Sequence, residues 1–148
     1  MQTKGESIPS ITSILRKISD EKTLMLLKNI KISDGKNHIP IKEMQLTTKQ
    51  YYSRISGLMD VGLIKRNRGR YFLTALGKVV YEAHMTIHKS LLYYWKLKAI
   101  DSIQTTDISE QDFSTLVDTL IDNYQLKDIF MKTPASFEHD FEEQRSVK

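Results

Sequence analysis

Cysteine is absent from this chain of 148 residues, and long apolar runs are absent too. Without cysteine there is no disulfide, no thiol nucleophile and no thiolate-bound zinc or iron–sulfur cluster, and the composition fits a reducing compartment. The longest purely apolar or aromatic run, Leu91–Trp95, is far shorter than the roughly 20 residues that a membrane span needs. The first residues carry no apolar stretch of the kind found in secretory signals. We therefore expect a soluble, cytoplasmic protein.

The usual motifs of enzymes are missing as well. The sequence has no glycine-rich phosphate loop, no serine or cysteine nucleophile motif and no close pair of acids in an apolar setting. His84 and His88 have a spacing that can chelate one metal ion, but Glu82 points away from both, so no local carboxylate completes the set. We expect no enzymatic activity, no metal and no cofactor, and we interpret the two histidines as interfacial residues.

Positive charge, by contrast, is concentrated in one part of the chain. Residues 1–100 hold 18 basic and 7 acidic side chains, whereas residues 101–148 hold 4 and 11. Residues 42–78 alone hold 8 basic side chains against 2 acidic ones. Such a local excess suits contact with phosphates, although a merely solvated basic surface is the alternative.

Apolar periodicity predicts several short helices before this basic region. The second of them has two candidate N-caps, Ser19 and Asp20, because both side chains can accept a hydrogen bond from the first turn. We expect Pro40 in the first turn of the third, which would open a helix-turn-helix. In order, the predicted elements are helices over Ile11–Ile18 and Glu21–Ile30, a turn over Ser33–Asn37 and a short helix near Ile39–Met44.

The next predicted helix, Thr48–Asp60, combines a buried stripe with an unusual outer face. Thr47 can cap it, and Tyr51, Ile55 and Leu58 fall on one side at about 100° per residue. The opposite side holds hydrogen-bonding groups with a few cations and no glutamate, whereas a plain surface helix more often shows Glu–Lys pairs. This mixture suits the reading of base edges and the holding of phosphates.

A basic hairpin is predicted directly after that helix. Gly62 ends the helix in a left-handed conformation, and Asn67–Gly69 forms the tip between strands Leu63–Arg66 and Arg70–Leu73. Four cations fall within six residues, and like charges on neighbouring strands would repel one another. An anionic partner would compensate for this repulsion. The cations are Lys65, Arg66, Arg68 and Arg70.

The framework Leu58-x-x-x-Gly62-Leu63-Ile64, with Gly69-Arg70-Tyr71-Phe72-Leu73-Thr74-x-x-Gly77, resembles the winged helix-turn-helix regulators of bacteria and archaea, of the MarR-like and ArsR-like types. The resemblance covers roughly residues 11–80. It implies a dimeric transcription regulator whose second motif helix enters the major groove, with Tyr52 standing where a small residue is more usual. With the hairpin cations Lys65 and Arg66, the expected DNA contacts are Thr48, Lys49, Gln50, Tyr52, Ser53, Arg54, Arg68 and Arg70.

A long helix, capped by Thr74 and extending to about Ile103, is predicted after the hairpin. Apolar residues recur along it at four- and three-residue steps, as in a coiled coil. Leu91–Trp95 is apolar on nearly all sides, so we expect burial against a second subunit and against the C-terminal part of this chain; packing within a monomer is the alternative. The expected dimer interface is Val80, Ala83, Ile87, Leu91 and Tyr94.

The remaining sequence predicts a linker at Thr105–Asp107 and two further helices. Acidic side chains such as Asp112 and Asp118 form a solvated face in this interpretation, although repulsion of DNA or contact with another protein are alternatives. Residues 133–148 are expected to be a flexible tail. The helices are Glu110–Asn123, capped by Ser109, and Leu126–Met131; the domains are 10–77 for DNA binding, 78–132 for dimerisation and 133–148 for the tail.

Together these observations predict a mainly α-helical protein with a small β-hairpin wing. The expected function is a homodimeric, sequence-specific, double-stranded DNA-binding transcription regulator associated with the nucleoid. Two alternatives remain open: a winged-helix module that binds an acidic protein, and a chromosome-architecture protein that binds all duplexes alike. The sequence leaves the operator, any small-molecule or metal effector and the sign of regulation undetermined.

Overall fold

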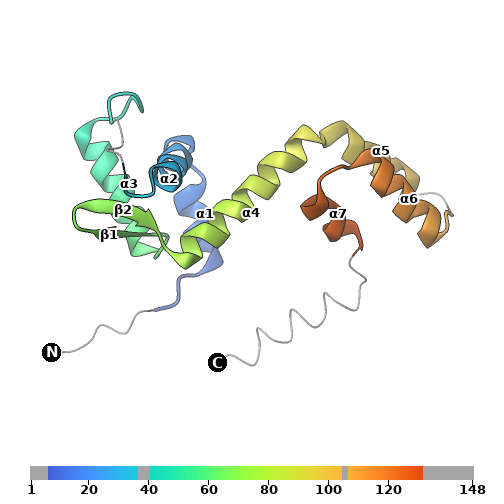
Figure 1. The fold of residues 1–148 in the computed structure, drawn as a ribbon, viewed down its shortest axis with the longest axis horizontal. Helices are drawn as coiled ribbons and strands as arrows, with labels where there is room; N and C mark the ends of the chain where they lie inside the picture. The colour runs from blue at the N-terminus through green and yellow to red at the C-terminus, as the bar shows by residue number, and fades with distance from the viewer. Residues whose placement is uncertain (1–6, 37–40, 105–106, 132–148) are drawn as a thin grey trace. The chain divides into compact units, whose positions relative to one another are not determined.

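A computed structural model describes residues 7–36, 41–104 and 107–131 of the chain, and these are mainly helical with one two-stranded antiparallel hairpin (Figure 1). The chain divides into two compact units, the first ending at Ala83 and the second beginning at His84. Among the described helices none is both long and apolar enough to cross a membrane. The elements are α1 Ile11–Ile18, α2 Glu21–Ser33, α3 Thr48–Asp60, β1 Ile64–Asn67, β2 Arg70–Leu73, α4 Ala75–Leu92, α5 Tyr94–Gln104, α6 Glu110–Leu120 and α7 Tyr124–Met131.

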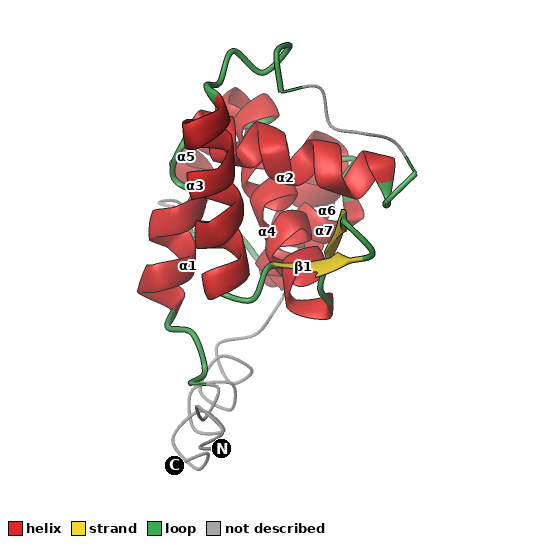
Figure 2. Ribbon diagram, turned by 90° about the vertical axis from the view of Figure 1, so that its left-hand side faces the viewer, coloured by secondary structure: helices red, strands yellow, loops and turns green. Residues whose placement is uncertain are grey.

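The first unit has a core in which α2, α3 and the hairpin meet (Figure 2). The buried stripe predicted for α3 is confirmed, since Tyr51, Ile55 and Leu58 are all buried. In α1, by contrast, no residue is buried, and Ile11 and Leu15 are exposed although they belong to its apolar face. Burying the shared apolar surface stabilises the unit by about 25 cal/mol per Å². The other buried apolar residues of this unit are Leu26, Leu27, Ile30, Met44, Val61, Leu63, Ile64, Leu73 and Tyr81.

The helix starts follow local capping rules. Thr47 caps α3 as predicted, and Asp20 rather than Ser19 caps α2, its carboxylate accepting from the Thr23 N–H at 2.9 Å. Helix α2 continues three residues beyond the predicted end, to Ser33, so that residue belongs to the helix and not to the turn. Left-handed conformations at Asp34 and Gly35, with φ of 41° and 72°, then end the helix.

The short helix expected near Ile39–Met44 does not form over the part that the structure describes; Ile39 and Pro40 lie outside it. Residues 41–45 make a turn, in which the N–H of Met44 donates to the Ile41 carbonyl at 3.2 Å. Gln45 then takes a left-handed φ of 52°, which prevents another helical turn. Met44 is buried, so the segment keeps its apolar anchor without being a helix.

The base of the hairpin is fastened to the start of α4. Thr74 caps α4 as predicted, because its hydroxyl accepts from the Gly77 N–H at 2.9 Å and donates to the Gly62 carbonyl at 2.5 Å. The Thr74 N–H also donates to the Leu63 carbonyl at 3.0 Å. Gly62 has the expected left-handed φ, 73°, and Gly77 lets α4 approach the Leu63 carbonyl oxygen, which a Cβ would meet at 1.9 Å.

The hairpin closes through a two-residue turn at Arg68 and Gly69, whose φ values are 49° and 77°. Positive φ at both positions is the type I′ geometry that matches the twist of the strands. In the register that forms, Lys65 lies opposite Phe72, and Arg66 lies opposite Tyr71. The predicted cross-strand repulsion between cations is therefore not present at these two positions, because the strands pair each cation with an aromatic residue.

The prediction of one continuous helix from Thr74 to Ile103 is wrong, because the helix is broken at Tyr93 into α4 and α5. The Tyr93 N–H donates to the Ser90 carbonyl at 3.1 Å, a three-residue bond in place of the helical four-residue one. The Ser90 hydroxyl in turn donates to the Ile87 carbonyl, a competition that bends helices. The break allows Tyr93 and Leu97 to pack against the core of the second unit.

That second core is formed by α5, α6 and α7. Helix α6 starts after its predicted cap, Ser109, but ends at Leu120, three residues earlier than expected, and α7 starts at Tyr124, two residues earlier. The exposed acidic residues of α6 include Asp118, which forms an ion pair with Lys127 of α7 at 3.2 Å. The predicted tail, residues 133–148, lies outside the described residues. Ile100, Val117, Ile121 and Leu126 are the buried residues of this core.

Candidate functional site

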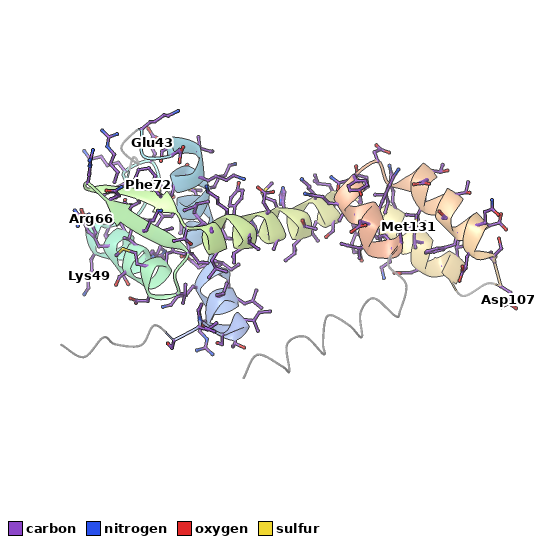
Figure 3. The ribbon with its side chains drawn as sticks, turned by 60° about the horizontal axis from the view of Figure 1, so that its bottom comes forward. Glu43, Lys49, Arg66, Phe72, Asp107 and Met131 are labelled. Carbon is purple, nitrogen blue, oxygen red and sulfur yellow. The ribbon has the colours of Figure 1, made fainter. Side chains whose placement is uncertain are left out.

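One side of α3 presents a polar surface free of acidic side chains. From Thr48 to Met59 the helix contains no Asp or Glu, and its single exposed cation on this side is Lys49. Figure 3 shows Lys49 and Arg66, from α3 and β1, at the same edge of the first unit. We call this surface the polar face of α3; its exposed residues are Thr48, Lys49, Tyr52, Ser53 and Ser56.

Two predicted contact residues on α3 are already engaged within the protein. The side-chain oxygen of Gln50 accepts from the Thr47 N–H at 3.0 Å, while the Gln50 N–H donates to the Thr47 hydroxyl, which is a capping box. A bidentate contact to adenine needs both ends of the amide, so Gln50 would have to release this bond to read a base. Gln50 therefore has a structural role in α3.

Arg54 is the second engaged residue. Its Nε donates to the Asp20 carboxylate at 2.9 Å, which joins α3 to the N-terminus of α2. The hydrogen bond from Arg54, together with that from Thr23, lowers the pKa of Asp20 from 3.8 to about 2. The charge of Arg54 is thus balanced by Asp20, and no sequence pattern indicates this pairing because 34 positions separate the two residues.

The four cations of the hairpin are all exposed. None of them forms an ion pair with another residue that the structure describes. Arg70 donates to the Gly35 carbonyl at 2.5 Å, and the Arg66 guanidinium lies 6.0 Å from the Tyr71 ring centre. Lys65 and Arg68 have no such contact within the described parts of the chain, so their charges face solvent.

A hollow of about 150 Å³ lies between α3 and the hairpin. Tyr51 and Tyr52 line it from α3; Lys36, which follows α2, and Tyr71 of β2 were not among the predicted site residues. Burial raises the pKa of Tyr51, and the nearby Tyr71 and Tyr52 act in the same direction, so this phenol stays neutral at physiological pH. The remaining lining residues are Ser33, Gly35, Ile41, Arg66, Gly69 and Arg70.

The residues predicted for a dimer interface are mostly exposed in the single chain. Ile87 is 60% exposed, Leu91 64% and Tyr94 46%, while Ala83 is exposed and Val80 is half-buried. Tyr94 belongs to α5, beyond the break at Tyr93, so it does not lie on one continuous helix with the other four.

The two histidines lie near one another on α4. Burial lowers the pKa of His84, and the neighbouring His88 lowers it further. Within the described residues no three His, Cys, Asp or Glu side chains are close enough to share a metal ion.

Comparison of the chain with protein-family profiles, with curated proteins and with solved structures finds no match.

Proposed function

We propose that this chain is a winged helix-turn-helix protein that binds double-stranded DNA in a sequence-specific manner and regulates transcription. In this proposal α3 is the recognition helix in the major groove, and the hairpin is the wing that contacts phosphates beside it. The residues that meet DNA are those whose side chains face solvent without an acidic partner, in particular Lys49, Tyr52, Ser53, Lys65 and Arg68.

One observation carries the proposal: the acid-free polar face of α3 and the cationic hairpin lie at the same edge of the first unit, where Tyr52, Arg66 and Arg70 line one hollow. Four exposed cations on one hairpin, without ion pairs among the described residues, make a strongly positive surface. Duplex DNA carries a negative charge about every 1.7 Å of its axis, so its backbone complements such a surface. The adjacent hydroxyl and phenol groups of Ser53 and Tyr52 can then reach base edges and methyl groups.

The proposal includes a homodimer. Large apolar side chains, such as Ile87 and Leu91 on α4 and Trp95 on α5, are exposed in the single chain, and a second copy would cover them. A dimer would also place two copies of α3 on two half-sites about one turn of DNA apart.

Fluorescence anisotropy with duplex DNA at several salt concentrations tests the proposal. If each protomer of a dimer contacts about five phosphates, log affinity should fall with log salt with a slope of about −9. Lys65→Gln with Arg68→Gln removes two wing charges without touching Arg70, whose hydrogen bond to Gly35 is structural. This variant should bind every duplex more weakly, and the slope should change to about −5.

Selection of bound sequences from a random pool then tests specificity. Enrichment of one motif supports a regulator, whereas equal recovery of all sequences would indicate an architectural protein. No binding of any duplex at micromolar concentration and low salt would contradict DNA binding and favour a module that binds an acidic protein.

A further inference from the structure

A second basic surface flanks α3 on the side away from the hairpin. The C-terminal end of α1 carries Arg16 and Lys17, and both side chains are exposed. Figure 2 shows α1 beside α3 in the first unit. A surface hollow of about 280 Å³ lies between the two elements, and neither cation was among the residues predicted to contact DNA. Its lining residues are Arg16, Lys17, Asp20, Thr23, Ser53, Arg54, Gly57 and Leu58.

The position of Lys17 is set by a glycine of α3. A Cβ on Gly57 would lie 3.2 Å from the Lys17 Nζ and 3.3 Å from its Cδ, so the lysine crosses α3 where that helix has no side chain. This brings the ammonium group close to the backbone of α3, and Lys17 and Ser53 line the same hollow. The α1 cation therefore borders the polar face of α3 directly.

The net charge of this hollow is positive. Its one carboxylate, Asp20, is balanced by Arg54, whose Nε is 2.9 Å away. Arg16 and Lys17 make no ion pair with any residue that the structure describes. Two uncompensated cations consequently remain beside α3, on an element 30 or more positions away from it in the sequence.

The two basic surfaces lie on opposite sides of the polar face. Residues of an α-helix are about 100° apart, so Ser56 lies near the middle of this face, with Tyr52 about 40° to one side and Gly57 about 100° to the other. Tyr52 lines the hollow beside the hairpin, whereas Gly57 lines the hollow beside α1. The polar face is thus bordered by the wing cations on one side and by Arg16 and Lys17 on the other.

We propose that Arg16 and Lys17 bind the phosphate backbone on the groove edge opposite to the one held by the wing. The major groove is about 12 Å wide, and a strand of phosphates runs along each of its edges. A helix lying in the groove with cations on both flanks can contact both strands. This inference rests on the proposed DNA binding. The anionic partner of Arg16 and Lys17 is then the strand of the same duplex that the wing does not contact.

The test uses Arg16→Gln with Lys17→Met in the full chain, since methionine is uncharged and its unbranched side chain extends as far as the Cε of the lysine that crosses Gly57. Binding to specific and to random duplex should weaken, and the magnitude of the salt slope should fall by about 2 for each protomer. Ethylation interference should lose its phosphate signals on one edge of the groove. The wing variant Lys65→Gln with Arg68→Gln should lose signals on the other edge.

A matched control removes two charges elsewhere: Lys28→Gln on α2 with Lys98→Gln on α5, both exposed and neither lining the two hollows. This control should leave the slope unchanged, and thermal melting checks that every variant is folded. If the wing variant lowers the slope while the α1 variant leaves slope and interference pattern intact, the assignment of α1 is wrong and DNA binding stands. If the unmodified protein binds no duplex, both proposals fall together.

Discussion

Position 77 requires glycine because the backbone of Leu63 packs directly against it. The carbonyl oxygen of Leu63 occupies the space that any β-carbon at this position would need, at 1.9 Å. The obstacle is main chain, and the same carbonyl is fixed by its bond from the Thr74 N–H. A side chain at position 77 can therefore be accommodated only if the hairpin base moves.

We predict that Gly77→Ala lowers the free energy of unfolding by about 3 kcal/mol, because a backbone group cannot move aside as a side-chain end can. Urea unfolding followed by circular dichroism measures this. Gly57→Ala is the control: the obstacle there is the flexible end of Lys17, and alanine in a helix gains about 0.5–1 kcal/mol over glycine. Equal effects of both substitutions would show that the contact with Leu63 does not constrain the fold.

A second prediction at the residue scale concerns the ion pair between Asp20 and Arg54 and its effect on the pH dependence of stability. The pKa of Asp20 is about 2 in the folded protein, below its ordinary 3.8, so the pair stabilises the fold above about pH 4 and the contribution is lost as the pH falls towards 2. Arg54→Met should raise the pKa of Asp20, as measured by NMR titration of its carboxyl group, and should flatten the loss of stability in this window. Lys127→Gln, which breaks the pair with Asp118, should leave the pKa of Asp20 unchanged.

Residues governed by local rules were predictable from sequence, whereas those with distant partners were not. Thr47, Gly62 and Thr74 act within a few positions, and their capping or left-handed roles are confirmed. Gln50 also follows a local rule, because Thr-x-x-Gln is a capping box, although the family resemblance implies a DNA contact for this residue. Arg54 could not be assigned, since no periodicity relates it to Asp20.

At the scale of elements, the first turn of α3 has two roles: it caps the helix and it contributes to the polar face of α3. Its first turn contains no acid, and Gln50 supplies the capping acceptor. Gln50→Glu keeps this acceptor and adds a charge that the helix dipole favours, so the free energy of unfolding should stay the same or rise by a few tenths of a kcal/mol.

The same substitution should weaken duplex binding several-fold, since the new carboxylate would lie close to phosphates. Thermal melting and anisotropy on one preparation separate the two effects. Glu43→Gln, on the turn before α3, serves as a charge control away from the polar face. Unchanged affinity of the Gln50→Glu protein would remove the first turn of α3 from the DNA contact surface.

The elements that differ from expectation are those decided by packing. Residues 41–45 have helical composition, but the left-handed Gln45 stops them after a single turn. The break at Tyr93 falls within a run of five apolar residues whose pattern is compatible with one continuous helix. Tyr93 and Leu97 pack against the core of the second unit, and such contacts cannot be inferred from the periodicity of α4.

At the scale of the whole molecule, the exposed apolar side chains of α4 and α5 call for a partner. We predict that Leu91→Glu shifts the protein from dimer to monomer in sedimentation velocity experiments, because a buried charge without a counterion opposes association. Leu92→Glu is the matched control, since Leu92 is also exposed but lies about 100° further around the helix. Dissociation by Leu92→Glu with no effect of Leu91→Glu would place the interface on another face.

The hairpin can accept inserted residues at its tip but not at its base. Around Gly69 nothing would obstruct an added β-carbon, so residues inserted between Asn67 and Arg70 would lengthen its reach into solvent. One residue added beside Gly62 would instead disrupt the two bonds that Thr74 donates to the Gly62 and Leu63 carbonyl groups. Residues that lengthen the hairpin should therefore be inserted at its tip. Differences in hairpin length among any descendants of this sequence should accumulate at the same place.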